Sequence, residues 1–150
     1  EVILAGRRIN NHMSAHIAQK TVKMLINADR PVKGAKVGVL GLTFKEDCND
    51  LRNSKVPDIL KELATFGIDA IIHDPIASAP EAVHEYGLTL SPIEAFKDLD
   101  AVILAVSHKE FLALGQAHIE GLVHEGGVLV DVKSVLEPTK VSRKLHYWSV

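Results

Sequence analysis

The hydrophobic positions of this chain follow two different patterns. Residues 8–28 place apolar side chains at helical spacing without an intervening Gly or Pro, which predicts one long amphipathic helix. Pro31 and Gly34 come next and should end it. After this point the pattern changes to short apolar runs, most of them followed by a helical pattern.

The short apolar runs predict the strands of a parallel sheet. They are residues 36–40, 68–73, 101–106 and 128–132, with residues 88–90 as a less apolar fifth run. Continuous Val, Ile and Leu runs are typical of strands buried on both faces. Helical patterns begin near Ser54 and at residues 79–85, 91–96 and 108–122. We therefore expect an α/β, Rossmann-like doubly wound parallel sheet of about five or six strands, preceded by a long helix.

Composition narrows the functional class. A chain of 150 residues with 47% hydrophobic content can bury one substantial core. The net charge of −2 comes from mixed acids and bases, so we expect neither a nucleic-acid partner nor a membrane anchor. No apolar run approaches the roughly 20 residues that span a bilayer. The single cysteine, Cys48, cannot form an internal disulfide, which indicates a cytoplasmic location.

The turn after the first predicted strand resembles a dinucleotide-binding turn only in part. Gly38 and Gly41 match two positions of G-x-G-x-x-G, but a polar loop of about ten residues follows in place of a helix N-terminus. Asp74 ends the second strand too far along the chain, because a ribose-binding acid follows the glycines by about 20 residues. We expect no pyrophosphate at this turn, and Asp74 should shape the turn before Pro75.

Side-chain charge is what the loop at residues 42–53 offers. Lys45 directly follows Phe44, and an aromatic ring beside a cation at a strand exit suits a nucleotide. Lys133 leaves the last predicted strand. In the common doubly wound order these two strands are two places apart, about 10 Å, so both lysines could converge on one ligand. A purely solvated Lys133 is the alternative.

Other polar residues have structural interpretations. Asp50 and Arg52 could form an ion pair that fixes the loop, and Ser54 could cap the next helix. His108 either lines the crevice or begins a helix. Cys48 lies among acids that oppose thiolate formation, so we do not expect it to be a nucleophile. We expect no metal site.

Three segments carry a family resemblance: GLTFKEDCNDLRNSKV, the HDP step and DVKSVL. They resemble the C-terminal, UDP-binding domain of the UDP-glucose/GDP-mannose dehydrogenase family. EVILAGRRINN resembles the end of that family's central helix, so residues 1–33 are expected to be a linker and dimerisation helix and residues 34–150 the UDP-sugar-binding domain. ILAGRRIN, LRNSKV and DVKS are most similar to UDP-N-acetylglucosamine and UDP-N-acetylgalactosamine 6-dehydrogenases of capsule or Vi-type polysaccharide biosynthesis.

The resemblance implies a reaction and a set of residue roles. Two NAD molecules oxidise the C6 alcohol of a UDP-sugar to the uronate through a thiohemiacetal on a catalytic cysteine. Phe44, Lys45 and Lys133 are implied to bind the UDP-sugar, with the two lysines on the diphosphate, and Arg52 to reach toward NAD. UDP-glucose enzymes tend to have arginine where Lys133 stands, and lysine cannot make a bidentate contact. Arg7 and Arg8 are assigned either to the cleft or to a helix surface or subunit interface.

The resemblance also implies partners outside these residues. The NAD fingerprint and the catalytic cysteine belong to an N-terminal half of the same polypeptide, so the chain, which opens without methionine like a fragment, is expected to be inactive alone and to contain no catalytic residue. The full-length protein is expected to be a homodimer. Two alternatives stay open: a free-standing nucleotide-binding module, and a structural or dimerisation domain built on the long helix.

Overall fold

The structure, a computed structural model, describes the backbone of residues 2–150 and the side chains of residues 12–150. Within this part of the chain, five parallel strands form one sheet in the order β2-β1-β3-β4-β5. The strands are β1 (Val37–Leu40), β2 (Ile71–His73), β3 (Leu99–Leu104), β4 (Val123–Asp131) and β5 (His146–Ser149). The α-helices are α1 (Val2–Asn27), α2 (Val56–Thr65), α3 (Ala79–Tyr86), α4 (Lys109–Leu114) and α5 (Gln116–Glu120). Two 3₁₀ turns, η1 (Ile93–Ala95) and η2 (Pro138–Lys140), complete the fold.

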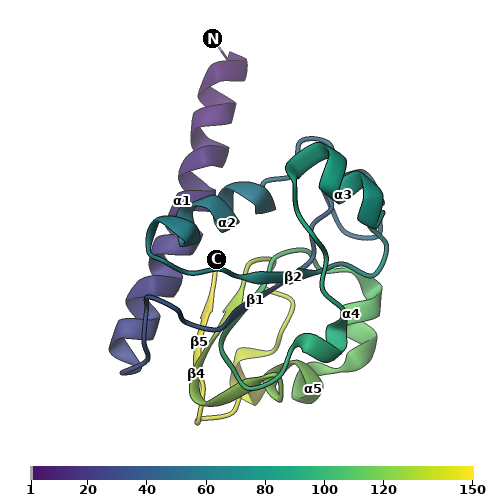
Figure 1. The fold of residues 1–150 in the computed structure, drawn as a ribbon. Helices are drawn as coiled ribbons and strands as arrows, with labels where there is room; N and C mark the ends of the chain where they lie inside the picture. Colours follow the sequence, from purple (N-terminus) through teal and green to yellow (C-terminus); the bar gives the residue numbers. More distant parts are fainter. Residues whose placement is uncertain (1) are drawn as a thin grey trace.

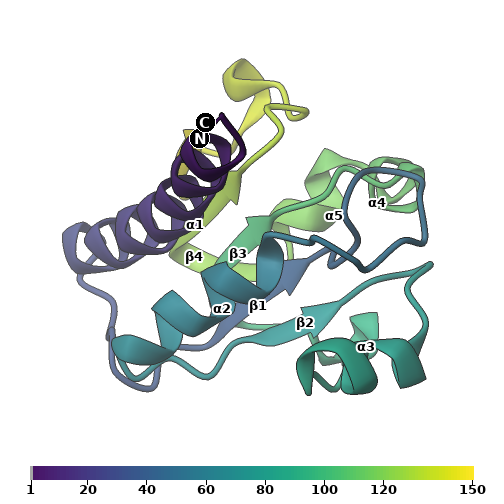
Figure 2. The ribbon, with the colours of Figure 1, turned by 90° about the horizontal axis from the view of Figure 1, so that it is seen from above.

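Helices cover both faces of the sheet (Figures 1 and 2). Helices α1 and α2 lie together on one face, and α4 and α5 lie on the other. Successive strand residues enter the two cores in turn: Val39 packs on the α1 and α2 side, and Leu40 packs with Phe111 of α4. The predicted α/β class, with a parallel sheet buried on both faces, is therefore confirmed.

The C-terminal part of α1 belongs to the same core as the sheet. Ile17, Val22 and Leu25 are buried there with the apolar face of α2. The side chains of Arg7 and Arg8, which the sequence placed at the cleft or an interface, lie outside the described residues. Of the helices described, none combines the length and apolarity required to cross a membrane.

Three local predictions need correction. Residues 88–90 do not form a strand; Ser91 alone donates a backbone hydrogen bond to Ile72 of β2, and Pro92 has no N–H to continue a ladder. The fifth strand comes instead from the C-terminal tail, residues 146–149, where β5 pairs with β4. The helix predicted at residues 91–96 is only the short 3₁₀ turn η1. The helix predicted at residues 108–122 is divided into α4 and α5 at Gly115, whose φ is 89°.

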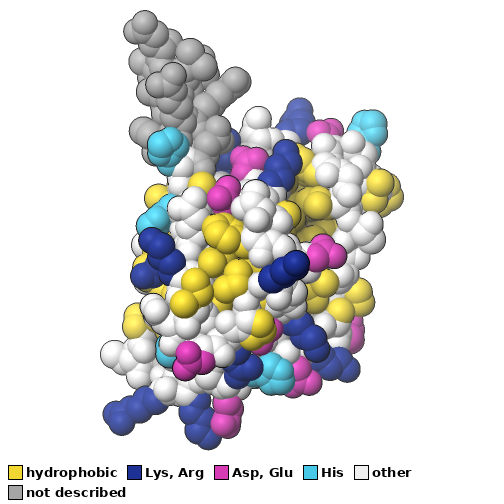
Figure 3. All heavy atoms as spheres, turned by 60° about the vertical axis from the view of Figure 1, so that its left-hand side comes forward, with side chains coloured by type: hydrophobic (Ala, Val, Ile, Leu, Met, Phe, Trp, Pro, Cys, Tyr) yellow, Lys and Arg dark blue, Asp and Glu magenta, His cyan; other side chains and the backbone are white. Residues whose placement is uncertain are grey.

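Charged side chains show no segregation by sign on the face in Figure 3. Acidic and basic groups alternate there around a patch of hydrophobic side chains. This arrangement agrees with the mixed charge of the sequence.

Candidate functional site

The loops that the sequence selected gather at one edge of the sheet. All strands are parallel, so the segments that leave β1, β2, β3 and β4 emerge at the same carboxyl edge. Strand β3 lies between β1 and β4, so the exits of β1 and β4 are two strand positions apart, as predicted. Phe44 and Lys133 lie on these two exits.

A pocket of about 180 Å³ occupies this edge and brings the two residues together. Phe44 and Lys133 line it with the exit of β3, the beginning of α2 and the side of α1. The lining includes Met13, Ser14, Phe44, Lys55, Val106 and Lys133. Phe44 keeps 51% of its surface exposed, which is unusual for a large aromatic side chain. The site therefore combines an accessible ring, a cation and apolar walls.

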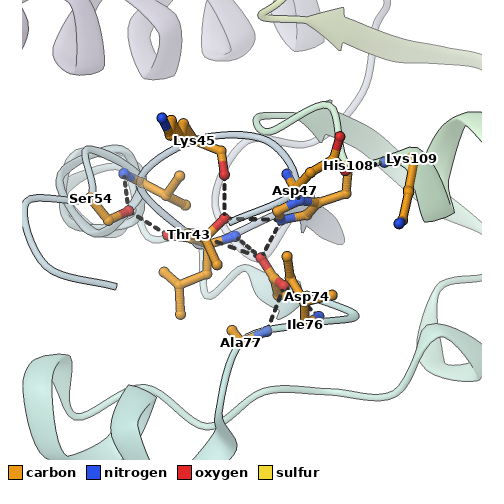
Figure 4. Close-up of polar contacts among 11 residues, drawn as sticks. Thr43, Lys45, Asp47, Ser54, Asp74, Ile76, Ala77, His108 and Lys109 are labelled. Carbon is orange, nitrogen blue, oxygen red and sulfur yellow. Dashed lines mark hydrogen bonds and ion pairs between the residues drawn. The ribbon is translucent and has the colours of Figure 1, made fainter. Parts of the chain in front are cut away.

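Asp74 fixes the loop that carries Phe44. One carboxylate oxygen accepts the N–H groups of Leu42 and Thr43, at 2.7 and 3.2 Å. The other accepts the N–H groups of Ile76 and Ala77, both at 2.9 Å, which forms the turn that the sequence predicted after β2 (Figure 4). Asp74 thus ties the exit of β1 to the exit of β2.

His108 is the buried centre of this network rather than a ligand-binding group. Its Nδ1 accepts the backbone N–H of Asp47 at 3.0 Å, so the ring proton of a neutral imidazole lies on Nε2. Nε2 then donates to Asp74 at 2.9 Å and lies 3.0 Å from the Thr43 hydroxyl. Because the His108 side chain is fully buried, the interpretation that it begins a helix holds, as the residue before α4.

The network sets the charge of Asp74. Burial alone would raise the pKa of this carboxyl, but the hydrogen bonds from His108 and from backbone N–H groups lower the pKa to about 2. Asp74 is therefore ionised at neutral pH and acts as a permanent acceptor. It has no free lone pair directed at a ribose, which explains why the dinucleotide interpretation of this residue fails.

Further contacts close the loop at its other end. Ser54 accepts the first helical N–H, that of Val56, at 3.2 Å, and donates to the carbonyl of Leu42. The capping function predicted for Ser54 is present, although the formal N-cap residue of α2 is Lys55. The hydroxyl of Tyr86 donates to the carbonyl of Leu51. The loop is thus a fixed platform for Phe44.

Lys45 and Arg52 lie outside the pocket. The Lys45 carbonyl accepts the Thr43 hydroxyl at 2.9 Å, while its side chain points away from the Asp74 and His108 cluster (Figure 4). Arg52 is paired with Asp50, at 3.1 Å between Nε and Oδ1, as the structural interpretation predicted. It lines a separate hollow of about 560 Å³ with acidic residues of α3.

The backbone turn that carries Lys133 is also held in place by hydrogen bonds. Asp131, fully buried at the end of β4, accepts the N–H groups of Val135 and Leu136 at 3.1 and 2.8 Å. It also accepts the hydroxyl of Tyr147 in β5 at 2.7 Å. Burial first, and then the hydrogen bond to Asp131, raise the pKa of Tyr147 to about 12. The D-V-K-S turn therefore owes its shape to a buried carboxylate, as the β1 loop does.

The turn after β1 does not fit a dinucleotide. A Cβ on Gly38 would lie 2.5 Å from a ring carbon of Phe96, and one on Gly41 would lie 2.5 Å from Cβ of Val106. Gly41 also has a φ of +100°, which favours glycine. Packing and the turn thus account for both glycines. Since α2 begins only at Val56, no helix N-terminus follows Gly41 to receive a pyrophosphate.

Sequence reasoning missed two features of the site. It did not connect His108 with Asp74, and it did not select Lys55, which lines the pocket from the beginning of α2. The available signal was the position of Lys55 directly before a helix at the carboxyl edge.

Cys48 is half-buried in the loop, and His16 packs edge-on against Trp148 with ring centroids 5.6 Å apart.

Comparison with known proteins identifies relatives of the chain. Residues 38–138 match the UDP-glucose/GDP-mannose dehydrogenase family, UDP binding domain. A UDP-N-acetyl-D-glucosamine 6-dehydrogenase of Pseudomonas aeruginosa is 43% identical over 145 residues, which are 97% of this chain and 34% of that protein. Protein CapL of Staphylococcus aureus is 40% identical over 148 residues, 99% of this chain and 35% of that protein.

A solved structure supports the fold. The NDP-N-acetyl-D-galactosaminuronic acid dehydrogenase from Methanosarcina mazei Go1 matches 100% of this chain with 31% of its own, at a TM-score of 0.85 and 23% identity. The chain spans about a third of the length of the curated relatives that it matches. Because the family match covers residues 38–138 of 150, the chain belongs to the UDP-glucose/GDP-mannose dehydrogenase family and contains its UDP binding domain.

Proposed function

We propose that this chain is the UDP-sugar-binding part of an NAD-dependent UDP-sugar 6-dehydrogenase. The substrate is a UDP-N-acetylhexosamine, whose C6 alcohol is oxidised to the uronate. The observation that carries the proposal is the pocket in which Phe44 and Lys133, from two strand exits, meet. The name of the Pseudomonas aeruginosa relative, a UDP-N-acetyl-D-glucosamine 6-dehydrogenase, supports the sugar class.

Each proposed substrate contact follows from the chemistry of the side chain. Phe44 offers an exposed aromatic face on which a uracil ring can stack. Lys133 supplies a point charge for the diphosphate. Lys45 approaches the UDP-sugar from the exposed side of the loop, next to Phe44. By holding the nucleotide, these residues orient the sugar for reaction.

The rest of the active site belongs to the proposed N-terminal half of the same polypeptide. NAD, which accepts the hydride from C6, is assigned to that half, because the β1 turn of this chain does not fit a dinucleotide. Arg52, beside its hollow at the edge of the loop, is proposed to reach toward NAD there. Residues 1–33 continue the linker and dimerisation helix of a homodimer, and the 150 residues alone are expected to be inactive.

Calorimetric titration with UDP tests the proposal. We expect the chain to bind UDP, and Phe44→Ala and Lys133→Met each to raise the Kd by about tenfold. Lys140→Met is the matched control, because Lys140 is an exposed lysine outside the pocket that pairs with Glu137. Absence of UDP binding to the unchanged chain, or equal affinities for the two lysine variants, would contradict the proposal.

A second measurement separates the enzyme from a free-standing binding module. In a full-length protein that contains this chain, UDP-N-acetylglucosamine should drive NAD reduction, followed at 340 nm. Lys133→Met should raise KM for the UDP-sugar more than KM for NAD, because the residue contacts only the sugar nucleotide. UDP binding without NAD reduction would favour the binding module.

A further inference from the structure

Lys55 is a second cation of the same pocket. It lies directly before α2, is half-buried and lines the pocket with Phe44 and Lys133. Lys45, the partner that the sequence suggested for Lys133, is not part of the lining. The pocket therefore receives its two lysines from the beginning of α2 and from the exit of β4.

The charge of this pocket is not balanced by the protein. Among the described residues, no carboxylate lies within 4.0 Å of the ammonium group of Lys55 or of Lys133, and no Asp or Glu lines the pocket. Two of the other described lysines do have such partners: Lys140 pairs with Glu137 and Lys144 with Glu125. Two unpaired cations beside one partly enclosed hollow favour an anionic occupant.

The backbone of Lys55 is held in place. The Ser14 hydroxyl of α1 donates to its carbonyl oxygen at 3.2 Å. On one side, Ser54 is bound to Leu42 and to the N–H of Val56; on the other, Val56 is buried in the core. The Lys55 stem thus starts from a fixed point between α1 and α2. A lysine whose backbone is already held in place loses less conformational freedom when its ammonium group binds an anion.

We propose that Lys55, together with Lys133, binds the diphosphate of the UDP-sugar, with Phe44 contacting the base. This inference rests on the proposed function. It does not assign Lys45 to the diphosphate, because Lys45 does not line the pocket. The two lysines approach the pocket from separate elements, so a diphosphate, with two anionic groups, can contact both.

Calorimetric titration with UDP distinguishes the cations. Lys55→Met retains the length of the side chain and removes its charge, and we expect it to raise the Kd by about tenfold, as for Lys133→Met. Lys55→Arg restores the charge and should keep the Kd within about threefold of the unchanged chain. The control is Lys61→Met, because Lys61 is an exposed lysine of α2 that does not line the pocket. Its Kd should stay within about threefold of the unchanged chain.

Salt dependence gives a second readout of the charge. The UDP affinity of the unchanged chain should fall with added NaCl, and this dependence should be weaker in Lys55→Met, because one phosphate contact is gone. Melting temperatures of Lys55→Met and Lys61→Met should agree, which excludes a folding defect.

Each outcome decides a different claim. If Lys133→Met weakens UDP binding and Lys55→Met does not, the role of Lys55 is wrong and the proposed function stands. The role of Lys55 is also wrong if Lys55→Arg weakens binding as much as Lys55→Met. If the unchanged chain does not bind UDP, the proposed function fails and this inference fails with it.

Discussion

Asp74→Asn should loosen the loop that carries Phe44, although the side chain keeps its size. Asparagine has one acceptor oxygen where aspartate has two, so an amide N–H takes the place of one carboxylate oxygen. In one orientation this amide faces the N–H groups of residues 42–43 and His108; in the other it faces those of residues 76–77. Either way, buried donors lose their acceptor, which destabilises the fold.

The pKa of Asp74 gives the size of its contribution to the free energy of unfolding. Its value of about 2 in the folded protein lies below the ordinary 3.8, and this difference corresponds to about 2 kcal/mol of stability. Because folding lowers the pKa, the contribution is fully present above pH 3.8 and is lost as the pH falls toward about 2. The difference in the free energy of unfolding between the unchanged chain and the variant should therefore shrink by about 2 kcal/mol across that pH range. In a chain of this size, about 2 kcal/mol lowers Tm by roughly 4–8 °C.

Urea unfolding of the unchanged chain and of Asp74→Asn at a series of pH values measures this difference in free energy directly. Asp69→Asn is the control, because Asp69 is exposed and its carboxylate makes no hydrogen bond within the described part of the chain. The control should leave the pH dependence of the free energy of unfolding intact. A difference between the unchanged chain and Asp74→Asn that stays constant from about pH 6 to about pH 2 would refute the reasoning.

Three further predictions concern packing and charge elsewhere. Gly38→Ala should lower the free energy of unfolding by about 1–3 kcal/mol, because its Cβ would lie 2.5 Å from the ring of Phe96; urea unfolding measures this, and an unchanged midpoint would contradict it. Absorbance at 295 nm should show Tyr147 titrating near pH 12, and Tyr147→Phe should remove that transition and cost about 1 kcal/mol through the lost bond to Asp131; a transition near pH 10 that Tyr147→Phe removes would contradict this. Arg52→Ala should leave Tm unchanged in a thermal melt, because its ion pair is exposed; a large decrease would mean that the pair fixes the loop.

Much of the candidate site could be located from the sequence. Parallel strands fix the edge at which ligands bind, so the exits at residues 42–53 and 133–136 could be selected from the strand pattern alone. The strand pattern points to Phe44 and Lys133, and these two residues line one pocket. The same argument points to Lys45, but the position of a residue in the chain does not determine the direction of its side chain. The backbone contacts of the loop turn Lys45 outward and leave the beginning of α2 at the pocket.

The buried residues that hold the loops of the site in place are harder to predict than the residues that line the pocket. His108 and Thr43 are 65 positions apart in the sequence, and Asp74 and Leu42 are 32 apart, so no local pattern pairs them. An isolated histidine after a strand is equally compatible with a ligand contact and with a buried structural role. Complete burial of the ring and its three polar contacts decide for the structural role.

The sequence by itself determined the layers of this protein and the family to which it belongs. Continuous apolar runs separated by helical patterns require strands buried on both faces, and burial of apolar surface is a property of each segment on its own. The tertiary structure alone decided that the tail adds the fifth strand, that Asp74 and His108 fasten the β1 loop, and that Lys55 faces the pocket. These outcomes depend on side-chain directions and hydrogen bonds between distant segments, which exist only after the chain has folded.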